Sequence, residues 1–99
     1  MKYTNAKIEE AGLYYVGHHR TAYIEIDLET RGGGARITIP VDRVEELVDT
    51  FENDIQENVE DGFYIEHLKG VPVRLLLDDT GKIIAFGDIF SEEDEMMKL

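Results

Sequence analysis

One periodic stretch, residues 41–61, constrains the fold of this chain more than any other. Its apolar side chains recur at steps of three and four, the spacing that places them on one face of a helix: Val41, Val44, Leu47, Val48, Phe51 and Ile55. A capping pattern opens the stretch, with Asp42 followed three residues later by Glu45, and Gly62 closes it. We therefore expect a helix whose apolar face packs into the core.

The opposite face of this stretch is acidic. Its acids are Glu45, Glu46, Asp49, Glu52, Asp54, Glu57, Glu60 and Asp61. Arg43 is the only basic residue in residues 41–61. Acids in the last turn oppose the helix dipole by about 0.3–1 kcal/mol each, so we expect the far end to fray near Gln56. We accordingly take residues 41–57 as the part of the helix that packs on the rest of the fold.

The charge of the chain is localised in the same half. Residues 1–40 hold five basic and five acidic residues, which cancel, so residues 41–99 carry the whole net charge of −12. Such a field repels phosphate backbones, which argues against direct nucleic-acid binding, and it attracts basic partners at a rate that falls with salt. The alternative is that the acids serve solubility alone.

The residues before the helix predict an antiparallel meander. Residues 8–16 form a strand that Gly12 interrupts with a bulge or bend, after a polar lead over residues 1–7. Residues 21–29 alternate apolar and polar side chains, and residues 35–39 resume that alternation after the glycine loop 32–34.

The residues after the helix predict a hairpin. Residues 63–70 are a turn or a single helical turn, and two apolar strands then follow, over residues 71–77 and 82–90. The DDTG turn at residues 78–81 joins them, and Gly87 marks a bulge or a close backbone approach. Ser91 resembles the cap of a short terminal helix over residues 91–99.

Together these elements predict a single domain, 1–99, of α+β class. Its antiparallel sheet has about five strands (three-strand meander, helix, C-terminal hairpin), with the main helix packed on one face. A small, partly open barrel closed around that helix is the alternative. The chain has no cysteine, no membrane-spanning run and no signal-peptide core, so we expect a cytoplasmic protein without contact with a membrane.

The motifs that could bind a phosphate or a metal ion, or take part in catalysis, also have structural explanations. Glycines 32–34 lack a following Gly-Lys-Ser/Thr and lead into a strand, which favours a hairpin loop over a phosphate loop. His18 and His19 are adjacent and His67 is distant, which favours a polar turn over a metal site. Asp78, Asp79 and Asp88 flank one hairpin and are candidate ligands of a weakly bound divalent cation, although a turn explains Asp78 and Asp79 equally well. Ser91 precedes a run of acids, where a cap is the simpler role. We therefore predict no enzyme activity and no cofactor.

Several aromatic residues fall outside the expected core. They are Tyr3, Tyr14, Tyr15, Tyr23, Phe63 and Tyr64. Tyrosines beside acids on a sheet face are typical of a protein interface. The alternatives are a second, partly buried sheet face or a homodimer contact.

Two segments, residues 12–34 and 66–89, together resemble a loosely defined group of small phage and prophage proteins. The residues that carry the resemblance are Gly17, His18, Thr21, Gly32, Gly33, Gly34, Leu68, Lys69, Gly70, Val73, Arg74, Ile83 and Gly87. This chain lacks the tryptophan expected shortly before its Leu-Lys-Gly, and its helix is more acidic. The resemblance implies a mobile-element origin without a known reaction.

The leading functional hypothesis is a non-enzymatic interaction or inhibitor protein, encoded by a phage, that binds a basic host protein. The expected contacts are Glu45, Glu46, Asp49, Glu52, Glu57 and Tyr23. In its sharpest form the acidic helix face imitates a row of phosphates and blocks a nucleic-acid-binding protein. The alternatives are a small-ligand or metal-binding domain that uses the histidine turn and the glycine loop, and a self-associating accessory module.

Overall fold

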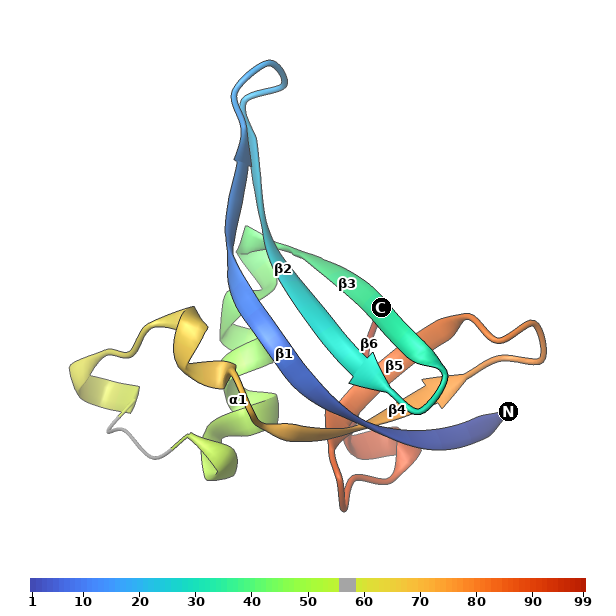
Figure 1. Cartoon of the computed structure of the whole chain (residues 1–99). Coiled ribbons are helices and arrows are strands. Elements are labelled where there is room, and N and C mark those ends of the chain that lie inside the picture. Colours follow the sequence, from blue (N-terminus) through green and yellow to red (C-terminus); the bar gives the residue numbers. More distant parts are fainter. Residues whose placement is uncertain (56–58) are drawn as a thin grey trace.

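The computed structural model describes residues 1–55 and 59–99 and contains one six-stranded antiparallel sheet curled into a half-barrel (Figure 1). Its strands are β1 (Lys2–Val16), β2 (Thr21–Thr30), β3 (Gly33–Pro40), β4 (Pro72–Leu77), β5 (Ile83–Asp88) and β6 (Met97–Lys98). Their order across the sheet is β3-β2-β1-β4-β5-β6. The α+β class is confirmed, and the strand number is six where the sequence predicted about five.

Strand β1 joins the meander to the C-terminal hairpin. Residues 2–7 pair with β4, and the strand from Ala6 onward pairs with β2. The polar lead predicted for residues 1–7 is therefore wrong, because its backbone is held by a strand some seventy residues away in sequence. The register shift lies between Ile8 and Glu10, whereas Gly12 pairs regularly with Glu25.

The helical segment is shorter than predicted. It runs through a 3₁₀ turn η1 (Val41–Arg43), helix α1 (Val44–Phe51) and a 3₁₀ turn η2 (Glu52–Asp54), and Ile55 is already extended. The predicted capping pattern is not formed, because Arg43 is the N-cap of α1 and makes no side-chain cap hydrogen bond. An end at Asp54 agrees with acids that oppose the dipole of the last turn.

Further short turns connect the strands. They are η3 (Val59–Asp61), η4 (Ile65–Leu68) and η5 (Glu93–Glu95). Turn η4 confirms the single helical turn predicted for residues 63–70. In the part of the chain that the structure describes, no helix is long and apolar enough to cross a membrane.

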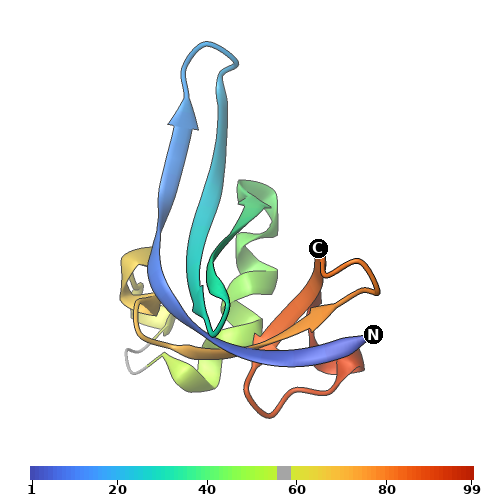
Figure 2. The same ribbon diagram turned by 45° about the vertical axis from the view of Figure 1, so that its right-hand side comes forward.

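The core lies between the helix and the concave face of the sheet (Figure 2). Leu47 and Phe51 are fully buried, and the Phe51 ring packs on that of Phe86 at 5.3 Å between centroids. Val41 and Val44, predicted for the same apolar face, remain exposed. They lie in the first turns, where the helix leaves the sheet beyond the end of β3.

The C-terminal segment packs on the other face of β4 and β5. Met96 contacts Leu76 and Ala85 in a second, small apolar cluster. The predicted cap at Ser91 is wrong, since Ser91 is buried against Gly87 and the capping box of η5 is formed by Glu92 and Glu95. The close approach predicted at Gly87 is confirmed, because a β carbon there would lie 2.7 Å from Ser91 Oγ.

Candidate partner-binding surfaces

The outer face of the helix carries an acidic stripe, which we define as Glu45, Asp49 and Glu52. All three side chains are exposed and recur at steps of four and three, so they lie along one side of the helix. Among residues 1–55 and 59–99, no basic group forms an ion pair with any of them. The negative charge of the stripe therefore has no counter-charge in direct contact among the described residues.

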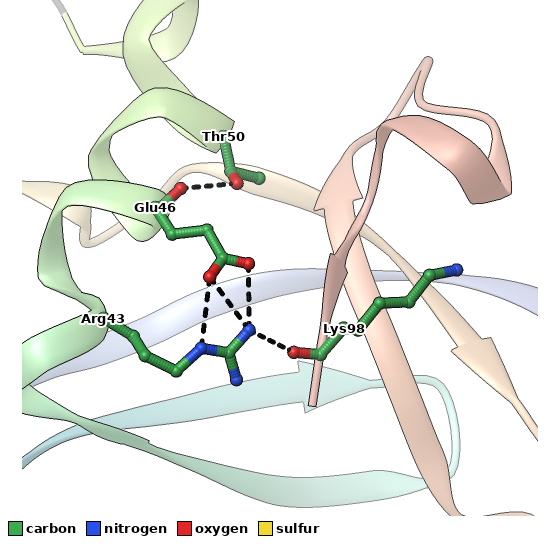
Figure 3. Close-up of polar contacts among 4 residues, drawn as sticks. All are labelled: Arg43, Glu46, Thr50 and Lys98. Atoms are coloured by element: carbon green, nitrogen blue, oxygen red, sulfur yellow. Dashed lines mark hydrogen bonds and ion pairs between the residues drawn. The ribbon is translucent and has the colours of Figure 1, made fainter.

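Glu46, predicted to belong to this site, forms an ion pair within the chain. Arg43 donates from Nη2 to both carboxylate oxygens of Glu46, at 3.1 and 2.9 Å, and from Nε to Oε1 at 3.1 Å (Figure 3). The same Nη2 donates to the main-chain carbonyl of Lys98 at 2.6 Å. The hydrogen bond with Glu46 raises the pKa of Arg43 above its ordinary value. Glu46 is thus neutralised locally, and it orients the arginine that ties the helix to β6.

Two further contacts were predicted, Glu57 and Tyr23. Glu57 lies outside the described residues. Tyr23 is half-buried on the outer face of β2, where its ring packs against Tyr14 at 5.3 Å between centroids. Tyr14 is the more accessible ring of the pair.

A two-stranded arm, residues 13–23, projects from the body of the fold (Figures 1 and 2). Strand β3 ends at Pro40, which pairs with Tyr23, and β4 pairs with β1 only over residues 2–7. The β1–β2 hairpin therefore continues beyond both of its neighbours. It ends in a turn over residues 17–20, and it contains no acid although the chain has 22.

One side of the arm continues the core-facing side of the sheet. Its side chains are apolar and exposed to solvent. Leu13 pairs with Ile24 and Tyr15 pairs with Ala22, so both side chains lie on the face that buries Ile24. Leu13 is 65% exposed and Tyr15 is 62% exposed. The helix starts beside the base of the arm with Val41 and Val44, which are 40% and 36% exposed. We call these four residues, Leu13, Tyr15, Val41 and Val44, the apolar ledge.

The ledge was not predicted from the sequence as a site. The sequence predicts Tyr15 outside the core, but it predicts Leu13, Val41 and Val44 in elements whose apolar side chains are covered. The predicted strand lengths contained a sign of the ledge. The strands at residues 8–16 and 21–29 are both longer than the third strand at 35–39, so part of their hairpin has no third strand beside it.

The histidine turn and the glycine loop do not form one site. Residues 18 and 19 precede β2, whereas glycines 32–34 follow it, so the two loops lie at opposite ends of a ten-residue strand, about 33 Å long. Within the described ranges, no three or more His, Cys, Asp or Glu side chains are grouped to hold a metal ion.

The aspartates of the C-terminal hairpin serve local structure. Asp78 accepts hydrogen bonds from the main-chain N–H groups of Thr80 and Lys82, and Asp79 contacts the N-terminal ammonium at 3.3 Å. Asp88 is at the far end of β5 and accepts from the Phe90 N–H at 2.8 Å. The three carboxylates therefore do not converge on one cation position.

A surface pocket of about 470 Å³ lies where the helix ends, lined in part by Asp54, His67 and Lys69. One carboxylate oxygen of Asp54, Oδ2, is buried without a hydrogen-bond partner in the part of the chain that the structure describes. Burial and then the nearby charge of Asp88 raise the pKa of Asp54. This carboxylate therefore destabilises the fold when it is ionised.

Comparison of the chain with protein families, with curated proteins and with solved structures finds no match. Arguments about its function therefore start from the surfaces described above.

Proposed function

We propose that this chain is a non-enzymatic interaction protein that binds a basic protein partner through the acidic stripe and the apolar ledge. The observation that carries the proposal is that the acidic stripe and the apolar ledge, both exposed, lie next to each other. Glu45 directly follows Val44, so the charged stripe begins where the exposed apolar side chains of the ledge end.

The two surfaces contribute differently to binding. Aromatic and aliphatic side chains that become buried in an interface supply most of its affinity, which assigns the anchoring role to Leu13 and Tyr15. Exposed acids without intramolecular partners accelerate encounter with a basic surface and orient it. The partner that fits is therefore a basic protein with an apolar patch beside its lysines and arginines.

The sharpest form of the proposal is nucleic-acid mimicry. Glu45, Asp49 and Glu52 span eight residues of the helical segment, which places a carboxylate about every 4.5–6 Å along its axis. Phosphates follow one another about every 3.4 Å along the axis of one DNA strand, so the stripe approaches this density. The expected partner is a nucleic-acid-binding protein of a host cell, and the resemblance to phage proteins motivates this choice of host.

The experiment is affinity capture on the immobilised protein from nuclease-treated bacterial lysate at low and moderate salt. The wild-type chain is compared with Leu13→Ser/Tyr15→Ser and with Glu45→Lys/Asp49→Lys/Glu52→Lys. We expect one basic protein to be retained by the wild-type chain and lost from both variants. A partner that both variants retain contradicts the proposal, and a partner without a nucleic-acid-binding surface contradicts its mimicry form.

Self-association through the arm is a second candidate function. It is favoured by one observation, the lack of acids in residues 13–23 of a chain with a net charge of −12, because two copies can meet there without mutual repulsion. Sedimentation at several protein concentrations tests it. A concentration-dependent dimer that Leu13→Ser/Tyr15→Ser abolishes supports self-association, and a monomer at all concentrations contradicts it.

A further inference from the structure

Two arginines converge on one pocket on the side of the sheet opposite the helix. The pocket has a volume of about 500 Å³ and is lined by Tyr3, Thr4, Asn5, Arg31 and Arg74. Arg74 pairs with Asn5 across β1 and β4, and its neighbours Val73 and Leu75 point into the core, so Arg74 lies on the outer face. Arg31 reaches the same pocket from the turn between β2 and β3.

Neither arginine has a carboxylate partner among the described residues, although acids outnumber bases 22 to 10 in the chain. Arg36 pairs with Asp27 and Arg43 pairs with Glu46, whereas neither Arg31 nor Arg74 forms an ion pair with any described residue. Arg74 donates from Nη1 to the Ser91 carbonyl at 3.1 Å, and its guanidinium lies 5.1 Å from the centre of the Tyr3 ring. These contacts hold the guanidinium in place and leave its charge uncompensated.

None of the five residues that line the pocket is acidic. The pocket is therefore a local site of positive charge on a strongly negative molecule. The volume is in the range of small-molecule sites and exceeds what one inorganic ion fills.

We propose that this pocket binds the phosphate group of a small phosphorylated molecule. The planar guanidinium fork matches phosphate oxygens, and a phosphate monoester carries nearly two negative charges at pH 7, which two arginines balance. The Asn5 amide supplies a further donor, and the Tyr3 ring offers an apolar wall for the group that bears the phosphate. The overall charge of −12 repels a polyanion, so the ligand is a small molecule and not a nucleic acid.

The test is a titration of the ¹⁵N-labelled chain followed by amide chemical shifts at constant ionic strength. The probes are adenosine 5′-monophosphate, inorganic phosphate, adenosine and a short DNA duplex. We expect the monophosphate to shift amides at residues 3–5, 31 and 74 saturably, inorganic phosphate to shift the same amides more weakly, and adenosine and DNA to leave them unchanged.

Arg31→Gln is the decisive variant, because Arg31 is exposed in a turn and its replacement leaves the core unchanged. We expect it to weaken monophosphate binding about tenfold or more, the effect of losing one charge-assisted contact. Arg20→Gln is the matched control, since it removes an exposed arginine from the tip of the arm, away from the pocket. Equal weakening by both variants, shifts outside the pocket, or an equal response to adenosine overturns the proposal.

Discussion

Leu13 and Ile24 face each other across β1 and β2, yet Leu13 is 65% exposed whereas Ile24 is 1% exposed. Paired residues of an antiparallel sheet share a face, so the difference arises from what covers each strand. The helix that follows β3 starts beside β2, and β1 is the outermost strand at this height because β4 pairs only with residues 2–7. The exposed leucine is thus a consequence of topology.

The ledge is expected to be dispensable for folding. Leu13→Ser should change the free energy of unfolding by less than about 0.5 kcal/mol, because the side chain is already hydrated in the folded state. Ile24→Ala should lower it by about 2–5 kcal/mol, because it leaves a cavity in the core. Urea denaturation of the two variants checks the contrast, and a large loss for Leu13→Ser would show that the arm is a structural element.

Gly87 is expected to tolerate no side chain. Gly87→Ala should lower the free energy of unfolding by about 1–3 kcal/mol, because the new methyl group would overlap Ser91 at 2.7 Å from Oγ. Gly32→Ala is the control, since no atom lies within 4 Å of a β carbon at that position. Thermal unfolding of both variants, and of Gly87→Ala combined with Ser91→Gly, measures the effect. Failure of the double substitution to recover stability would place the strain elsewhere.

Arg43 is expected to stabilise the C-terminal strand. Arg43→Met should lower the free energy of unfolding by about 1–2 kcal/mol, because a charge-assisted hydrogen bond to the Lys98 carbonyl is lost. Glu46→Gln should have a smaller effect, since Arg43 can still reach that carbonyl. Amide hydrogen exchange at Leu99, whose N–H donates to the Ile84 carbonyl at 3.0 Å, should accelerate in Arg43→Met alone. Unchanged exchange would contradict this role.

Asp54 and Asp78 are expected to affect stability with opposite dependence on pH. The pKa of Asp54 is raised by burial and by Asp88, so its favourable contribution is present below the unfolded pKa, about 3.8, and is lost as pH rises through the folded value. The pKa of Asp78 is lowered, first by the hydrogen bond from the Thr80 side chain, so its contribution is present above about 3.8 and is lost as pH falls through the folded value.

Substitution by asparagine separates the two. Asp54→Asn should raise the melting temperature at pH 7, with the gain disappearing below about pH 4, whereas Asp78→Asn should lower it at pH 7, with the loss disappearing in acid. Melting curves between pH 3 and pH 7 test both variants. The same pH dependence for both would contradict the assigned causes.

Local patterns predicted much of the fold. Alternation over residues 21–29, the turn at residues 78–81 and the buried pair Leu47 and Phe51 all follow from short-range periodicity, and the structure contains them. The strand at residues 2–7 was missed because its core-facing side chains, Thr4 and Ala6, are small and its partner is β4.

The candidate site was predicted only in part. The exposure of Glu45 and Asp49 follows from helical spacing, and the Arg43–Glu46 pair is an i, i+3 contact that the sequence contained. The hydrogen bond of Arg43 to the Lys98 carbonyl and the exposure of the ledge could not be predicted in this way. Both depend on where elements that are distant in sequence end in space, and periodicity carries no information about that.

The most direct test of the central claim is the dissociation constant of the captured partner, measured by calorimetry with two charge-matched variants. Glu45→Lys/Asp49→Lys/Glu52→Lys and the control Glu9→Lys/Glu29→Lys/Asp94→Lys each replace three exposed acids and have equal net charge. We predict that the stripe variant binds at least about thirtyfold more weakly than the wild-type chain, and that the control stays within about threefold of it. Equal weakening by the two variants would show that overall charge, and not this helix face, governs binding.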